Sequence, residues 1–162
     1  MKSILKANHE NKLQESYIIP KRASSWLPSE IGFEPGPPRN LAPEGVKTLV
    51  VILGSGGVTP NPHRHGPGAA VIVNDTTYLI DAGEGIFRGL AWAAVSHPEL
   101  IAEHLAPHRL TRLFLTHLHS DHTIGLPAVW LMPWAYGRES PLDVYGPVGT
   151  RNLMEHLADA YQ

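Results

Sequence analysis

The stretch Thr116–His122 has the sequence THLHSDH and is the most informative part of this chain. It follows the apolar run RLFLT, which is typical of a buried strand. In an extended segment, residues i and i+2 point the same way, so His117 and His119 can bind one metal ion together. Asp121 and His122 follow at the turn and can face a second ion. Packing does not explain so many polar groups here, because burying them unpaired is costly.

The ligand types at this turn favour a hydrolytic metal site. Imidazole and carboxylate groups suit zinc, with iron or manganese as alternatives. Two neighbouring metal ions can clamp a bridging water and stabilise the oxygens of a displacement at phosphorus, sulfur or a carbonyl carbon. We therefore predict a binuclear metal site.

Composition narrows the classes of function. The 162-residue chain contains ten histidines and no cysteine, which excludes disulfides, thiolate zinc sites and cysteine nucleophiles. Its net charge of −2 gives no support for nucleic acid as a partner. The first residues do not resemble a signal peptide, and no apolar run is long enough to span a bilayer. We expect a cytoplasmic protein without a membrane partner.

The chain divides into two parts. Residues 1–45 are rich in proline and glycine, and we expect an extended N-terminal arm that Trp26, Leu27, Ile31 and Phe33 anchor by packing. After this arm, strands and helices alternate, which predicts an α/β fold. The expected strands are 48–53, 69–73, 77–80, 112–116 and 142–145, and the expected helices are 86–95, 98–106, 123–136 and 149–161.

Five segments together resemble a known family. HLHSDH is similar to the HxHxDH signature of the metallo-β-lactamase fold superfamily. The others are LIDAGEG at Leu79–Gly85, LGSGG at Leu53–Gly57, GLP at Gly125–Pro127 and YGP at Tyr145–Pro147. The last two resemble the tRNase Z and arylsulfatase-like branches. The resemblance covers residues 46–162.

The resemblance implies roles for five residues. His117 and His119 would bind the first of two zinc ions, and Asp121 and His122 the second. Asp121 would also orient the attacking water. Asp81 would lie behind the ligands and fix the histidine loop by hydrogen bonds, with a plain turn or cap residue as the alternative.

Other polar residues carry weaker signals. His63 and His65 have the i, i+2 spacing without a neighbouring acid, so they line either a substrate mouth or a solvated loop. Glu84 suits a helix start. We expect the histidines in or beside helices to be exposed: His97, His104, His108 and His156.

The resemblance also implies that the chain is incomplete. The family fold is an αββα sandwich of two similar halves, and residues 46–162 correspond to the first half. A third histidine, a bridging aspartate and a further histidine would come from later strands, and neither Asp143 nor His156 is a convincing substitute. We expect a truncated chain with an exposed apolar sheet face. A piece of a longer protein with a C-terminal half and a homodimer that rebuilds the sandwich are the alternatives.

The expected function is that of a zinc-dependent hydrolase, in which metal-activated water attacks a phosphodiester, sulfate ester or related ester of a small molecule. One alternative is a tRNA 3′-processing endonuclease, against which the near-neutral charge argues. Another is a truncated, non-catalytic metal-binding fragment or a half-domain that depends on a partner. A non-haem iron oxygenase is a third, because histidine ligation does not distinguish zinc from iron.

Overall fold

The computed structural model describes residues 5–8, 12–15 and 48–161. The predicted arm, residues 1–45, therefore lies mostly outside the described residues, as do its four proposed anchors. Within it, the structure describes the backbone of two short strands, β1 (Leu5–Asn8) and β2 (Lys12–Glu15). In the described part of the chain, no helix is long and apolar enough to cross a membrane.

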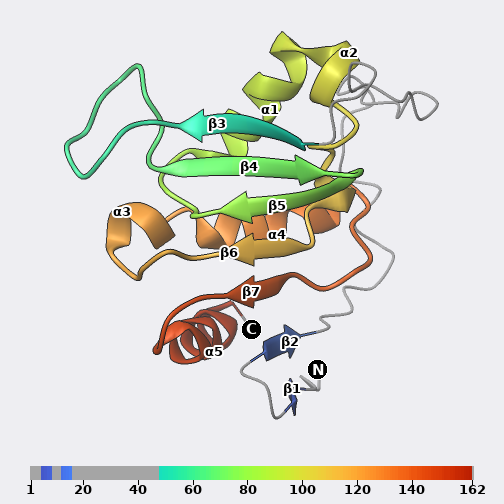
Figure 1. Ribbon diagram of the computed structural model, residues 1–162. Helices are drawn as coiled ribbons and strands as arrows, with labels where there is room; N and C mark the ends of the chain where they lie inside the picture. The colour runs from blue at the N-terminus through green and yellow to red at the C-terminus, as the bar shows by residue number, and fades with distance from the viewer. Residues whose placement is uncertain (1–4, 9–11, 16–47, 162) are drawn as a thin grey trace.

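The described strands form one mixed sheet in the order β1-β2-β7-β6-β5-β4-β3 (Figure 1). The remaining bounds are Thr48–Gly54 for β3, Gly68–Val73 for β4, Thr76–Ile80 for β5, Arg112–Phe114 for β6 and Asp143–Tyr145 for β7. Strands β3, β4 and β5 are antiparallel, whereas β5, β6 and β7 run parallel. The α/β prediction is confirmed.

A tight turn joins β4 to β5 at the predicted position. Asn74 and Asp75 have φ values of 44° and 66°. Short polar side chains tolerate this left-handed conformation, and two such residues in succession match the twist of a two-residue hairpin. The turn fixes the register of the hairpin, in which Val73 pairs with Thr76.

The helices lie outside the sheet, on its far face and beside its edges in Figure 1. Their bounds are Ile86–Ser96 for α1, Pro98–Ile101 for α2, Ser120–Thr123 for α3, Leu126–Ala135 for α4 and Thr150–Ala160 for α5, with a 3₁₀ turn at Pro107–Arg109. The helix predicted at 123–136 begins later than expected, at Leu126, and a separate short helix, α3, ends at Thr123. Gly125 separates them, since its N–H donates to the carbonyl of Ala82 (2.8 Å) instead of continuing α3.

Two further predictions are corrected. The helix expected at 98–106 ends as a regular α-helix at Ile101. The chain then turns so that His104, expected to be exposed, is buried with 5 % of its surface accessible. The hydroxyl of Thr77 donates to the His104 carbonyl at 2.6 Å. This contact with β5 spans 27 residues, and local periodicity does not indicate it.

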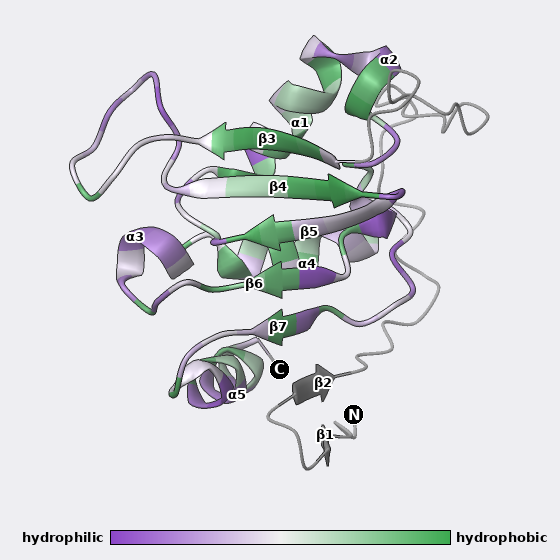
Figure 2. Cartoon of the chain, in the orientation of Figure 1, coloured by the Kyte–Doolittle hydropathy of each residue, from purple (hydrophilic) through white to green (hydrophobic). Residues whose placement is uncertain are grey.

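The two faces of the sheet have different surroundings. Inward residues of the central strands, among them Leu79 and Leu113, are fully buried with α1 and α4, which lie on the far side of the sheet in Figure 1. Apolar residues also run along the strands in Figure 2. On the other face, Val50 and Ile52 are 64 % and 65 % exposed. The prediction of a buried strand at 48–53 is therefore wrong, because β3 is an edge strand with one covered face.

Among the described residues, no helix covers the other face of the sheet in Figure 1. This face carries a row of aromatic rings. Tyr78, Phe114 and Tyr145 lie on neighbouring strands and point away from the buried residues beside them. The Phe114 ring lies 6.2 Å from that of Tyr78 and 4.7 Å from that of Tyr145, with which it is stacked. A partly exposed aromatic row of this kind belongs to a sheet face that can pack against another layer.

Candidate functional site

The site begins where two parallel strands end side by side. Ile80 of β5 pairs with Phe114 of β6. Asp81, the residue that follows β5, donates its backbone N–H to the Phe114 carbonyl at 2.8 Å. Because parallel strands leave the sheet at the same edge, Asp81 and Thr116 become neighbours although 35 residues separate them.

The buried carboxylate of Asp81 accepts hydrogen bonds from the histidine turn. One oxygen accepts from the backbone N–H of Thr116 at 2.8 Å. The Thr116 hydroxyl lies 3.0 and 2.9 Å from the two oxygens, and Nδ1 of His122 lies 2.8 Å from Oδ2. The strand predicted at 112–116 ends at Phe114 because the Thr116 N–H bonds to this side chain rather than to the sheet.

Asp81 adopts an uncommon backbone conformation to reach the turn. Its φ is 59°, in the left-handed region that aspartate tolerates better than most residues. Such a conformation costs about 1–3 kcal/mol and persists where the surroundings impose it. The hydrogen bonds to Thr116 and His122 are those surroundings. The role of Asp81 behind metal ligands stays a prediction.

The four predicted ligands lie together at the turn. The ring of His117 is 4.7 Å from that of His119 and 4.0 Å from that of His122. Nε2 of His122 lies 3.6 Å from a carboxylate oxygen of Asp121. Since Asp81 contacts Nδ1 of His122, the Nε2 atom is the one left to bind a ligand.

These donors fit zinc in kind. Imidazole nitrogens and a carboxylate are ordinary zinc ligands, and the histidine rings are close enough to share an ion. Among the described residues, no three or more His, Asp or Glu side chains are arranged so that they could hold a metal ion. The described part of the chain therefore offers at most two donor side chains for each predicted metal ion.

Main-chain hydrogen bonds fix the histidine turn to the end of β5. The N–H of Ala82 donates to the carbonyl of His122 at 2.8 Å, and Ala82 in turn accepts from Gly125. A Cβ on Gly125 would lie 2.2 Å from the carbonyl oxygen of Gly83. Glycine is therefore required at the junction of α3 and α4, because any side chain would separate the turn from the strand.

The same strand end also holds the glycine-rich loop between β3 and β4, residues 55–67. Gly83 donates to the carbonyl of Pro67 at 2.9 Å, and Gly66 donates to that of Glu84 at 2.8 Å. A Cβ on Gly83 would lie 2.5 Å from the carbonyl carbon of Gly66 and 2.6 Å from the carbonyl oxygen of Asp121. Three segments thus meet through backbone atoms at one glycine.

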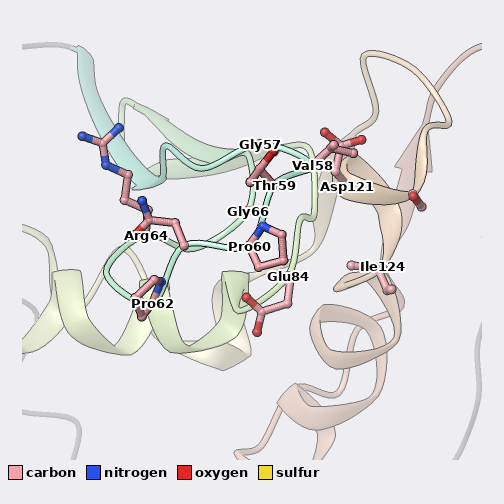
Figure 3. A pocket seen from close by; sticks show the side chains of 12 residues that line it. Gly57, Val58, Thr59, Pro60, Pro62, Arg64, Gly66, Glu84, Asp121 and Ile124 are labelled. Carbon is pink, nitrogen blue, oxygen red and sulfur yellow. The ribbon is translucent and has the colours of Figure 1, made fainter.

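A cavity of about 530 Å³ opens beside Asp121. Figure 3 shows Asp121 and Ile124 on one wall and Pro62 and Arg64 on the other. Its lining comes from the loop of residues 57–66, from Glu84 and from α3. Glu84 precedes the N-cap residue Gly85 of α1, and its carboxylate forms an exposed ion pair with Arg88 at 2.8 Å instead of capping the helix.

The two loop histidines lie elsewhere. His63 is exposed, and its backbone N–H donates to the side chain of Asn61 at 2.8 Å. His65 is half-buried and packs against Gly85 at the start of α1. It lines a neighbouring cavity of about 460 Å³ with Trp92. Neither histidine lines the cavity beside Asp121, and their substrate-mouth role stays a prediction.

Two polar residues had no role in the sequence-based prediction. Thr116 belongs to the histidine turn but had no predicted task, and its hydroxyl contacts both Asp81 and His117. Arg138 is buried with 1 % of its surface accessible, although it follows a glycine in a polar stretch typical of a surface loop. No local signal distinguishes Arg138 from an exposed arginine.

Comparison with known proteins identifies relatives of this chain. The sequence profile described as "Metallo-beta-lactamase superfamily" matches residues 63–144. Ribonuclease Z of Pyrococcus horikoshii is 34 % identical over 111 residues, which are 68 % of this chain and 33 % of that protein. Ribonuclease Z of Methanothermobacter thermautotrophicus is 37 % identical over 106 residues, 65 % of this chain and 31 % of that protein. The chain thus spans about a third of the length of these curated relatives.

Solved structures show the same fold. The short form of human tRNase Z superposes with a TM-score of 0.56 at 29 % identity, over 69 % of this chain and 39 % of that chain. The metallo-beta-lactamase fold protein YhfI from Bacillus subtilis gives a TM-score of 0.53 at 18 % identity, over 68 % and 40 %. The second likeness concerns the fold alone.

Proposed function

We propose, from the premise that this chain belongs to the metallo-beta-lactamase superfamily, that it is the metal-binding part of a hydrolase that processes the 3′ end of tRNA. The observation that carries the proposal is the histidine turn, hydrogen-bonded to a buried Asp81 beside a cavity that Asp121 lines. The similarity to ribonuclease Z proteins supports RNA as the proposed class of substrate.

This conclusion changes the order of the sequence-based hypotheses. The general ester hydrolase ranked above tRNA processing because the net charge of −2 gave no sign of a nucleic-acid partner. Net charge sums the whole chain and does not describe the groups around one cavity. The relatives favour the tRNA alternative, and no relative named above supports a sulfate ester.

Each predicted ligand has a definite task in this proposal. His117 and His119 would hold one zinc ion, and Asp121 and His122 the other. Two donors leave each ion short of the usual four, so further ligands would come from outside the described residues. Zinc supplies Lewis-acid activation of water and neutralises charge on the scissile phosphate.

The chain's own residues prepare this chemistry. Asp81 orients the ring of His122 through Nδ1 and so presents Nε2. The carboxylate of Asp121 faces the cavity, where it can accept a hydrogen bond from water and orient it toward a phosphodiester. The cavity walls from residues 57–66 and α3 hold the RNA end beside these groups.

A cleavage assay tests the proposal. The chain, together with the segment or partner that supplies the further zinc ligands, is incubated with zinc and a labelled precursor tRNA that carries a 3′ extension, and we expect release of the extension. His117→Ala and Asp121→Ala should abolish this cleavage, and chelation of zinc should abolish it reversibly. Turnover of aryl phosphate or aryl sulfate esters without RNA cleavage would overturn the RNA assignment.

A non-catalytic half-domain is the second candidate. Val50 and Ile52 are exposed on the uncovered sheet face, which favours association with another layer. Zinc content and oligomeric state separate the two candidates. About two zinc ions per chain in a discrete dimer would support an enzyme rebuilt from two copies. About one weakly bound zinc on an aggregating chain would support the half-domain.

A further inference from the structure

The Thr116 hydroxyl lies between a carboxylate and an imidazole. Its Oγ1 is 3.0 and 2.9 Å from the two oxygens of Asp81 and 3.0 Å from Nδ1 of His117. The backbone N–H of the same residue also donates to Asp81. Thr116 therefore contacts the buried carboxylate twice and one predicted zinc ligand once.

The donor inventory of these groups fixes the direction of each hydrogen bond. A hydroxyl has one proton to donate, and an ionised carboxylate accepts only. The hydroxyl proton of Thr116 therefore goes to Asp81, and its oxygen faces Nδ1 of His117 as an acceptor. Nδ1 must then carry the ring proton, which leaves Nε2 of His117 with a free lone pair.

The ring of His122 adopts the same tautomer through a direct contact with Asp81. Its Nδ1 lies 2.8 Å from an oxygen of Asp81, so that nitrogen also carries the proton. Nε2 of His122 is then free as well. One carboxylate thus acts directly on His122 and, through a hydroxyl, on His117.

We propose that Thr116 is a positioning residue that transmits the orienting effect of Asp81 to His117, so that one buried carboxylate sets the tautomer of two zinc ligands. The consequence for zinc rests on the proposed function, whereas the tautomer does not. The alternative is that Thr116 serves only through its backbone N–H, with no part for its hydroxyl.

Substitution at Thr116 separates these roles. Thr116→Val keeps the shape and the backbone N–H and removes the hydroxyl, whereas Thr116→Ser keeps the hydroxyl. Thr123→Val is the matched control, because its hydroxyl lies on the same turn and donates to the His119 carbonyl at 3.1 Å. All variants are prepared from the whole chain.

The first readout is the tautomer of each histidine in the metal-free protein, measured by long-range ¹H–¹⁵N NMR at about pH 8, where an ordinary imidazole is neutral. We expect Nδ1–H forms of His117 and His122 in the wild type, Thr116→Ser and Thr123→Val. In Thr116→Val, His117 should become a tautomer mixture while His122 stays unchanged. An unchanged His117, or a shift of both histidines, would overturn the proposal.

The second readout is zinc affinity by competition with a chromogenic chelator. We expect Thr116→Val to weaken binding by about 10-fold or more and both controls to stay within about twofold. Equal weakening by Thr116→Val and Thr123→Val would contradict a specific role for Thr116. If RNA cleavage is absent while the tautomers behave as expected, the proposed function fails and the positioning role stands.

Discussion

Asp81 and Arg138 are both buried and lie at opposite ends of β6, yet their surroundings differ in kind. Asp81 accepts from an amide, a hydroxyl and an imidazole just beyond the end of the strand. Arg138 donates to main-chain carbonyls, one of them that of Leu110 just before the strand, at 3.0 Å. The arginine therefore bonds to main-chain carbonyls, whereas the aspartate bonds mainly to the side chains of Thr116 and His122.

The remaining contacts of Arg138 explain its position. It donates to the carbonyls of Val129 (3.2 Å) and Trp130, and its guanidinium lies over the ring of Trp134. The Val129 carbonyl has no i+4 donor inside α4, because residue 133 is proline and lacks an N–H. Desolvation by burial lowers the pKa of Arg138 to about 10, so it stays charged at neutral pH. Burial of a charge alone thus does not indicate a functional site, whereas its partners do.

The largest expected effect is the loss of stability in Arg138→Met. Three carbonyls would lose their donor, which we expect to lower the free energy of unfolding by about 3 kcal/mol. Urea denaturation measures it. Zinc affinity of the folded variant should match that of the wild type, because α4 ends far from the turn. A loss below about 1 kcal/mol would show that these hydrogen bonds contribute little.

Asp81→Asn should weaken zinc binding and leave the fold intact. Asparagine tolerates the left-handed backbone at this position, so the fold should persist. The amide of asparagine keeps one acceptor oxygen, replaces the other by an NH₂ donor and carries no charge. It therefore no longer accepts from Thr116 and His122 at once, and we expect zinc affinity to fall about 10- to 100-fold. Chelator competition measures this change. Undiminished affinity would remove Asp81 from the metal site.

A smaller effect should appear at alkaline pH. Because burial lowers the pKa of Arg138 to about 10, the folded chain releases that proton at lower pH than the unfolded chain. The unfolded state then binds more protons above this pH, so Arg138 adds stability as pH rises. The difference in unfolding free energy between the wild type and Arg138→Met should widen by about 1 kcal/mol from pH 9 to pH 11. A constant difference would contradict this.

The smallest effect is expected for His63→Ala. His63 and His65 share the spacing of His117 and His119, but His63 is exposed in the loop. We expect zinc affinity to change by no more than about twofold, as for most surface substitutions. Isothermal titration with zinc gives the value, with His117→Ala as the positive control. A tenfold loss would instead place His63 among the ligands.

Most of the fold could be predicted because its signals are local. The apolar runs gave the positions of β3 to β7, and the polar pair Asn74 and Asp75 marked the hairpin. The break between α3 and α4 was missed because it depends on Gly125 meeting Ala82, a contact across the molecule. The burial of His104 depends likewise on a bond from Thr77.

The site likewise contains residues that local sequence indicates and residues that only contacts between distant segments reveal. The spacing in THLHSDH placed the four predicted ligands, and family resemblance pointed to Asp81. The link from Asp81 through Thr116 to His117 joins residues 35 apart and becomes visible only when β5 and β6 lie side by side. Arg138 had no signal at all, since its acceptors are backbone carbonyls that every sequence possesses.

The meeting point at Gly83 has a consequence for engineering. The loop joins the strand end through main-chain hydrogen bonds, and no side chain of Pro62 or Arg64 takes part in that junction. Both residues line the cavity. Substitutions at these two positions would therefore vary the contacts offered to substrates while the histidines keep their spacing.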